Sequence, residues 1–315
     1  MNFYIGVTDN QWFTYLAERH PDEVNFWRPG GGSFRAIEPG LPFLFKLHSP
    51  LDYIAGGGFF VRYSLLPLSL AWDAFGQKNG AADFTTFYEQ IERYRSPRGT
   101  MEPDPEIGCI VLVQPFFFPQ DDWIPVPEDW HPNIVQGKTY DTQDEIGARL
   151  WQQVQDRLAM YEPLSSVVDK EEESSIIEEE RERYGSEYPV RPRLGQGAFR
   201  VVVTEAYGRR CAVTGERTLP VLQAAHIKPY NESGPHRVDN GLLLRADLHI
   251  LLDRGYMTVT EDLHVEVSRR IKEDFHNGEH YYALHGSPLA NVPERCIERP
   301  SPEFVRWHNE HRFLG

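Results

Sequence analysis

Cysteine is scarce in this sequence. Three of the 315 residues are cysteines, Cys109, Cys211 and Cys296, and they lie far apart. An odd number of distant cysteines argues against a disulfide framework. Thr214 stands where the second cysteine of a CxxC zinc knuckle would follow Cys211. We therefore expect neither disulfides nor a cysteine-based zinc site to hold the fold.

Long apolar runs are also missing. No stretch approaches the ~18 apolar residues of a membrane span. The first residues, MNFYIGVTDNQWF, have neither the basic start nor the apolar core of a signal peptide. These absences predict a soluble cytoplasmic protein with no membrane partner, and the length and the 13% aromatic content are enough for two cores.

Positive charge is in short supply, because the net charge is −15 at pH 7. The deficit is uneven: residues 189–315 carry 17 Lys and Arg against 16 Asp and Glu, residues 162–187 carry 3 against 10, and residues 1–161 carry 12 against 21. The C-terminal part is therefore near neutral. Stable binding of DNA to it would require specific contacts rather than phosphate attraction alone.

An acidic segment divides the chain. Residues 162–188 include DKEEESSIIEEERERYGSEY, whose low complexity predicts an exposed helix or a flexible linker. It separates a predicted N-terminal domain, residues 1–161, from a predicted C-terminal domain, residues 189–315.

The N-terminal domain is predicted to be rich in strands. Alternating or buried apolar runs predict strands at 3–9, 42–47, 52–66 and 107–118, and helical periodicity marks 83–95 and 142–158. The glycines at 56–58 permit a bulge or a close backbone approach. A small β-barrel with peripheral helices is the simplest assembly, which makes the whole chain α+β.

Three polar residues dominate the C-terminal domain: His226, Asn240 and His249, separated by fourteen and nine residues. Two short strands, ending at His226 and beginning near Leu242, are joined by the polar loop NESGPHRVD. A compact hairpin followed by a helix would gather the three side chains around one metal ion and one phosphate.

The helix after the hairpin carries a second pattern. Asp247 is predicted to be its N-cap, and His249 and Asp253 then lie one turn apart on the same face. Two such side chains can bind one ion. Imidazole and carboxylate suit Mg²⁺ or Mn²⁺ when phosphate oxygens complete the shell. Phosphodiester hydrolysis needs both a base that activates water, which a neutral histidine supplies, and a cation that absorbs negative charge.

Basic residues near this pattern are candidate phosphate contacts. Lys228 and Arg245 are the preferred ones, and Arg237 and Arg254 are alternatives. For each of them a solvated surface position is the competing interpretation. His236 has two interpretations as well, a loop ligand for the metal or an exposed loop histidine.

Residues 194–255 resemble the HNH nucleases, which share a ββα-metal fold. The resemblance is carried by AAHIKPY, DNGLLL and RADLHILLD, with the flanks GQGAFRVVVTEAYGRRCAVTG and PEFVRWHNEHRF. It implies that His226 is the general base, that Asn240 holds the loop and the His226 backbone, and that His249 is a metal ligand. Asp253 stands where some relatives have a second histidine.

One position departs from that resemblance. The residue before the base is often a metal ligand in the superfamily, and here it is Ala225. The ion would then be held by His249, Asp253 and substrate oxygens. A non-cleaving DNA-binding protein with a degenerate metal site is the alternative that Ala225 keeps open.

Residues 1–160 resemble the EVE branch of the PUA superfamily, related to base-flipping readers of modified nucleotides. The likeness rests on the order of a first strand, PGLPFLFKL, IAGGGFFVRY and a helical segment. Together the two halves resemble the EVE–HNH modification-dependent restriction endonucleases of bacteria. This implies cleavage of double-stranded DNA that contains 5-methyl-, 5-hydroxymethyl- or glucosylated cytosine.

A reader of an extruded base needs aromatic faces for stacking and polar groups for the base edge. The aromatic candidates adjoin polar or loop-forming residues, and the carboxylates are candidate acceptors for the cytosine amino group. The candidates are Trp12, Trp27, Tyr53, Trp123 and Trp130, with Asp121 or Asp122 as the acceptor. Ordinary core packing is the competing interpretation for each aromatic residue. A front domain that reads phosphorothioate or a protein partner is the alternative at the level of function, and cleavage of both strands would favour a homodimer.

Overall fold

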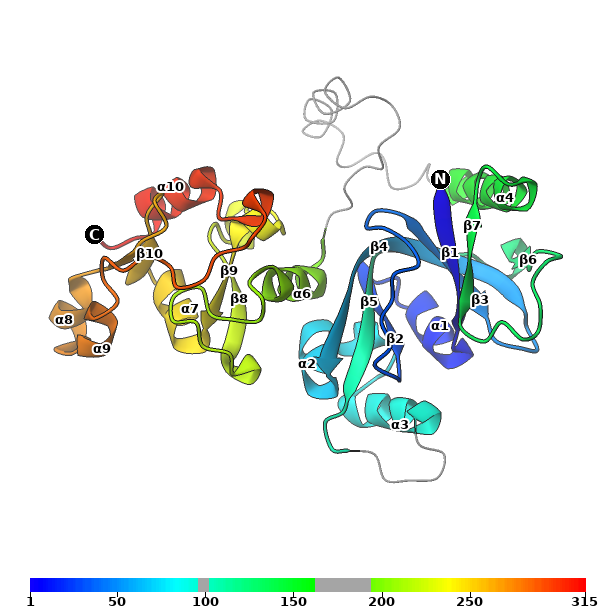
Figure 1. The fold of residues 1–315 in the computed structure, drawn as a ribbon, viewed down its shortest axis with the longest axis horizontal. Helices are drawn as coiled ribbons and strands as arrows, with labels where there is room; N and C mark the ends of the chain where they lie inside the picture. The colour runs from blue at the N-terminus through cyan, green and yellow to red at the C-terminus, as the bar shows by residue number, and fades with distance from the viewer. Residues whose placement is uncertain (96–101, 162–193) are drawn as a thin grey trace, which may run out of the picture. The chain divides into compact units, whose positions relative to one another are not determined.

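The computed structural model describes residues 1–95, 102–161 and 194–315. The chain divides into two compact units, Met1–Arg193 and Leu194–Gly315 (Figure 1). The predicted acidic linker, 162–188, lies outside the described residues. No helix in the described ranges is both long and apolar enough to cross a membrane.

A seven-stranded mixed sheet forms the centre of the N-terminal unit. Its order is β2–β5–β4–β3–β1–β7, and β6 pairs with β4. The strands are β1 (Asn2–Thr8), β2 (Glu23–Arg28), β3 (Pro42–Leu47), β4 (Tyr53–Pro67), β5 (Glu106–Phe117), β6 (Ile124–Pro125) and β7 (Gly137–Asp141). The four strands predicted from apolar patterning correspond to β1, β3, β4 and β5. The β2, β6 and β7 strands were not predicted.

The glycines of β4 allow the sheet to bend. A Cβ at Gly56 would lie 2.3 Å from the carbonyl oxygen of Phe116, and one at Gly57 would lie 2.7 Å from that of Phe43. The pairing of β4 with β5 shifts register between Gly57 and Phe59. The predicted bulge and close backbone approach are therefore both present.

This sheet curls strongly but does not close. The ring of Phe26 on β2 lies 4.7 Å, centroid to centroid, from that of Phe43 on β3, although β5 and β4 separate these strands in the sheet. Within the described residues the edge strands β2 and β7 do not pair, so the predicted barrel is open. Aromatic packing fills part of this seam, where Phe34 contacts Tyr4 edge-on at 5.1 Å.

Helices cover the curled sheet. Leu150 and Val154 of α4 are buried in one apolar cluster with Phe3 of β1. Trp12 of α1 packs against Phe26 and Phe45. The helices are α1 (Asn10–Ala17), α2 (Leu68–Phe75), α3 (Phe84–Arg95) and α4 (Glu145–Tyr161). Of these, α3 and α4 match the two predicted helices within a few residues.

The C-terminal unit begins with a helix, a hairpin and a second helix. These are α6 (Gln196–Ala206), β8 (Leu222–His226), β9 (Gly241–Arg245) and α7 (Ala246–Asp253). A single apolar cluster joins them, with Phe199, Leu243 and Leu248 nearly or fully buried. The remaining elements are β10 (Met257–Val259), β11 (Val265–Val267), α8 (Arg270–Phe275), α9 (Glu279–Tyr282) and α10 (Pro302–His311).

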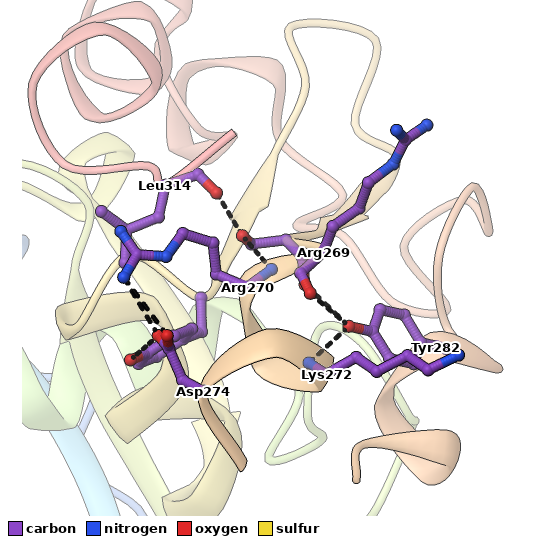
Figure 2. A network of polar contacts seen from close by, with 8 residues as sticks. Arg269, Arg270, Lys272, Asp274, Tyr282 and Leu314 are labelled. Carbon is purple, nitrogen blue, oxygen red and sulfur yellow. Dashed lines mark hydrogen bonds and ion pairs between the residues drawn. The ribbon is translucent and has the colours of Figure 1, made fainter. Parts of the chain in front are cut away.

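A polar network fastens the end of the chain to this unit. The Ser268 hydroxyl donates to the carbonyl oxygen of Leu314. Figure 2 shows Tyr282 donating to the carbonyl oxygen of Arg269. The backbone N–H of Leu314 also donates to the carbonyl oxygen of Gly255 at 2.9 Å. Because Gly255 lies two residues after the last residue of α7, the C-terminal segment supports the end of the helix that carries His249.

Candidate functional site

The β8–β9 hairpin places His226 at the start of the loop between its two strands, and hydrogen bonds of Asn240 hold this loop together. Asn240 is fully buried. Its Nδ2 donates to the carbonyl oxygens of Lys228, at 2.9 Å, and Pro235, at 3.0 Å, and its Oδ1 accepts from the Lys228 backbone N–H at 2.8 Å. Its own carbonyl oxygen accepts from the N–H of Ile227. These contacts tie Asn240 to Ile227, Lys228 and Pro235, and its predicted role in holding the His226 backbone stays a prediction.

Gly241 permits a close approach between the hairpin and α6. A Cβ at Gly241 would lie 2.5 Å from a methyl carbon of Val203 and 3.2 Å from the ring of Phe199. Phe199 in turn stacks on the imidazole of His226, with centroids 3.9 Å apart and planes 12° apart. The Asn-Gly pair therefore serves packing at the site as well as the turn.

His226 is held in its neutral form. Burial, aided by the neighbouring His236 and His249, lowers the pKa of His226 from 6.5 to about 4. An imidazole with this pKa is almost entirely unprotonated at pH 7 and can therefore accept a proton, although it is a weaker base than an imidazole with the usual pKa. The role of His226 as the general base stays a prediction.

His236 lies against His226. Nε2 of His226 and Nδ1 of His236 are 2.9 Å apart, and the ring of His236 stacks on Tyr230 at 4.5 Å. His236 is only partly exposed. The interpretation of His236 as an exposed loop histidine is wrong, because its ring lies between Tyr230 and His226. Its interpretation as a metal ligand stays a prediction.

A second cluster lies on α7. Nε2 of His249 is 3.3 Å from Oδ2 of Asp253, and Nδ1 of His249 is 2.8 Å from Oε1 of Gln223. Gln223 was not predicted as a site residue. An amide oxygen that accepts from Nδ1–H leaves Nε2 unprotonated and facing Asp253, the arrangement that second-shell partners impose on metal-binding histidines.

The donor set on α7 suits a divalent cation that keeps several non-protein ligands. No group of three or more His, Cys, Asp or Glu side chains suited to a metal occurs in the described residues. Two adjacent protein donors, His249 and Asp253, fit a hard cation that takes its other ligands from water and phosphate. Ala225 is fully buried in the apolar core and has no side-chain atom that could bind a metal. The β8 side chain that contacts His249 is that of Gln223.

The predicted phosphate contacts have protein partners. Arg245 forms an ion pair with Asp247 at 2.6 Å, which lowers the pKa of the Asp247 carboxyl. The prediction that Asp247 is the N-cap of α7 is wrong. The N-cap is Arg245, α7 begins at Ala246, and Asp247 lies in the first turn. The Lys228 ammonium lies 5.4 Å from the ring centre of Trp307, beside a cavity of about 220 Å³ formed with α10. Arg237 pairs with Asp239.

A larger cavity, of about 360 Å³, lies in the N-terminal unit at the seam between β2 and the segment that leads into β7. Arg28, the last residue of β2, donates to Oε1 of Gln136, just before β7, at 2.7 Å. The cavity is lined by aromatic and apolar side chains with a few polar groups. They come from Tyr4, Val7, Asp9, Trp12, Phe26, Trp27, Arg28, Pro29, Gly30, Gly32, Phe34, His48, Tyr94, Ile110, Val135 and Gln136.

Two of the predicted pocket residues line this cavity. The indole N–H groups of Trp12 and Trp27 donate to the carbonyl oxygens of Asn25 and Asn79, and only 2% and 9% of their surfaces are exposed. Both therefore form walls of the cavity.

The other five predicted pocket residues lie elsewhere in the N-terminal unit. Tyr53 and Trp123 are ring neighbours at 6.1 Å, Trp130 lies near the Lys46 ammonium, and Asp121 and Asp122 form a short 3-10 turn. None of the five lines this cavity.

Among the described residues, Asp9 is the one carboxylate that lines the cavity. Its Oδ1 accepts from the backbone N–H of Trp12 at 2.8 Å, and its Oδ2 accepts from the hydroxyl of Tyr94 at 2.5 Å. Burial and the Asp9 carboxylate raise the pKa of Tyr94 to about 12. Asp9 is the N-cap of α1, and the sequence around it has the pattern of an ordinary N-cap. No local pattern indicates that Asp9 also lines a cavity.

The segment that contains the hairpin and α7 has a recognisable family. Residues 211–260 match the HNH endonuclease family. This HNH segment includes His226, Asn240, His249 and Asp253. The local architecture of β8, β9 and α7 agrees with the ββα arrangement expected from the sequence. Divalent-metal dependence is general among HNH nucleases.

Solved structures show distant likenesses. TagI, described as a modification-dependent restriction endonuclease, is 17% identical, with 93% of this chain and 76% of TagI covered and a TM-score of 0.30. The ASCH protein from Zymomonas mobilis is 10% identical, with 48% of this chain and 94% of that chain covered and a TM-score of 0.33. TM-scores of this size establish no common fold. No curated protein matches the chain.

Proposed function

We propose that this chain is a modification-dependent DNA endonuclease, in which the HNH segment hydrolyses phosphodiester bonds and the N-terminal unit reads a modified cytosine. The observation that carries the nuclease half is the neutral imidazole of His226 near a His249–Asp253 pair within a segment that matches the HNH family. A base and a cation site at one hairpin are what metal-assisted hydrolysis requires.

In the proposed reaction His226 takes a proton from a water molecule. The oxygen of that water bonds to phosphorus, the bond from phosphorus to the leaving oxygen breaks, and the leaving oxygen takes a proton from solvent. Asn240 keeps the loop that carries His226 in place. A divalent cation, Mg²⁺ or Mn²⁺, would be held by His249 and Asp253 and would offset negative charge on the phosphate.

Support for the reader half comes from the cavity at the β2–β7 seam. Its volume of about 360 Å³ is at the small end of ligand pockets, as a single base requires. Its walls are aromatic, and Asp9 offers an acceptor to a base amino group. Extrusion of a base costs a few kcal/mol, which stacking and edge contacts in such a pocket can offset. Modified cytosine is the ligand that we propose.

Matched plasmids test both halves. Four plasmids of one sequence would carry cytosine, 5-methylcytosine, 5-hydroxymethylcytosine or glucosylated cytosine, each digested with Mg²⁺ or Mn²⁺. We expect metal-dependent cleavage of one or more modified plasmids and sparing of the unmodified one. Equal cleavage of all four would contradict the reader. Binding without cleavage under every condition would support the alternative of a non-cleaving DNA-binding protein.

A plasmid with phosphorothioate linkages and ordinary cytosine is the further control. If it alone is cut, the N-terminal unit reads the backbone, and the proposed assignment of its cavity to a base is wrong.

A further inference from the structure

We propose that His236 is a positioning residue that fixes the tautomer of His226, so that Nδ1 of His226 is the nitrogen that takes the proton from water. This inference rests on the proposed role of His226 as the base. The general resemblance to HNH nucleases does not include it, because His236 lies in the loop between the strands and outside the three residues that carry the likeness.

The hydrogen-bond partners of His226 are unequal. Nε2 of His226 is 2.9 Å from Nδ1 of His236. No protein group in the described ranges bonds to Nδ1 of His226. Only one of two facing ring nitrogens can carry the shared proton, because each neutral imidazole has one donor and one acceptor. The nitrogen left for a water molecule is therefore Nδ1, and it can act as a base only if the proton lies on Nε2.

The loop holds His236 where it can accept that proton in a hydrogen bond. The ring of His236 stacks on Tyr230, with centroids 4.5 Å apart and planes 12° apart. Its backbone follows Pro235, whose carbonyl oxygen accepts from Nδ2 of Asn240 at 3.0 Å. Asn240 therefore anchors the acceptor as well as the base. Phe199 stacks on His226 and limits rotation of its ring.

This arrangement also suits the protonated product of the first step. When Nδ1 of His226 takes a proton from water, the ring becomes an imidazolium whose Nε2–H still points at Nδ1 of His236. The bond between the rings then becomes charge-assisted, and charge-assisted hydrogen bonds are roughly twice as strong as neutral ones. The proton stays on His226, and His236 donates none to the reaction.

Two substitutions separate the hydrogen bond from ring packing. His236→Phe keeps an aromatic ring for Tyr230 but removes the acceptor, whereas His236→Asn puts an amide oxygen near the former Nδ1. Loss of an orienting partner of a metal-binding histidine typically costs about 10- to 100-fold, and we take the same range for the partner of His226. We expect the Phe variant of the full chain to lose about that factor in kcat on the plasmid that wild type cuts, with KM and Mn²⁺ affinity unchanged. The Asn variant should recover most of the rate.

A second measurement does not depend on cleavage. Long-range ¹H–¹⁵N spectra of the full chain labelled with ¹⁵N-histidine report the tautomer of each ring. We expect His226 to carry its proton on Nε2 in wild type and in the Asn variant, and to populate both tautomers in the Phe variant. His226→Ala would serve only to assign the signal.

The outcomes are distinct. A proton on Nδ1 of His226 in wild type, a Phe variant with the wild-type rate, or an Asn variant no better than the Phe variant would each overturn the role of His236. If wild type cleaves no DNA, the proposed function fails, and the spectra still decide whether His236 sets the tautomer.

Discussion

Asp9→Asn is the sharpest perturbation of the proposed reader. The amino group at C4 of cytosine is a donor, and Asp9 is the one carboxylate that lines the cavity within the part of the chain that the structure describes. Each oxygen of Asp9 already accepts one hydrogen bond, from Trp12 or from Tyr94, and each keeps a further lone pair for a base. In the Asn variant the amide oxygen can still accept from the backbone N–H of Trp12. The amide NH₂ replaces the other carboxylate oxygen, so that a donor faces the amino group of the base, which is itself a donor.

The magnitude follows from the type of bond lost. Hydrogen bonds to charged groups contribute about 1.5–3 kcal/mol, which corresponds to about 10- to 100-fold in affinity. Asn caps a helix about as well as Asp, so α1 should keep its start at Asn10 and the fold should survive. We therefore expect a loss of binding without a comparable loss of thermal stability.

Fluorescence anisotropy of the full chain on a labelled duplex with one modified cytosine, without metal, measures this effect. Asp121→Asn and Asp122→Asn are matched controls, because these carboxylates lie outside the cavity. Unchanged affinity in Asp9→Asn, or an equal loss in the control variants, would refute the assignment of Asp9 to the base edge.

The remaining predictions concern the HNH segment. His226→Ala should lower the cleavage rate by at least about 10²-fold while duplex affinity, measured by anisotropy, stays near wild type; a near-wild-type rate would remove this residue from the mechanism. Because the pKa of His226 is lowered to about 4 rather than 6.5, the base stays neutral as pH falls, so the rate at saturating Mn²⁺ should hold down to about pH 5 and decline only through about pH 4; an inflection near 6.5 would contradict this. His249→Ala and Asp253→Ala should each weaken Mn²⁺ binding in calorimetry, and unchanged affinity in both would place the ion elsewhere. Asn240→Ala should lower the rate at unchanged Mn²⁺ affinity, because the lost hydrogen bonds leave buried carbonyl oxygens unpaired and shift the His226 loop; a matching loss of Mn²⁺ binding would show that its effect is on the ion instead.

Local patterning was sufficient for much of the fold. The apolar runs that predict strands at 42–47 and 52–66 are a property of consecutive residues, and β3 and β4 form there. The pairing of His249 with Asp253 was equally accessible, because residues one turn apart on a helix are neighbours whatever surrounds them. The hairpin that carries His226 and Asn240 also followed from short-range signals, since its strands are joined by a polar loop.

The tertiary structure decided what those residues meet. Arg28 reaches Gln136 only because the sheet curls until β2 lies near the segment that precedes β7, and Asp9 meets Tyr94 only because α1 and α3 pack close together. The prediction of a barrel was wrong at the same seam. Whether a sheet closes into a barrel depends on how far the sheet bends and on the packing of side chains such as Phe34.

The contacts of the HNH segment divide in the same way. The order and spacing of His226, Asn240 and His249 are written in the sequence, and they were enough to indicate nuclease chemistry. The hydrogen-bond partner of each imidazole could not be predicted from the sequence, because Gln223 reaches His249 from another element and His236 reaches His226 across a loop. Sequence spacing determines which groups are available at the site, whereas hydrogen bonds between distant residues exist only after the core has packed.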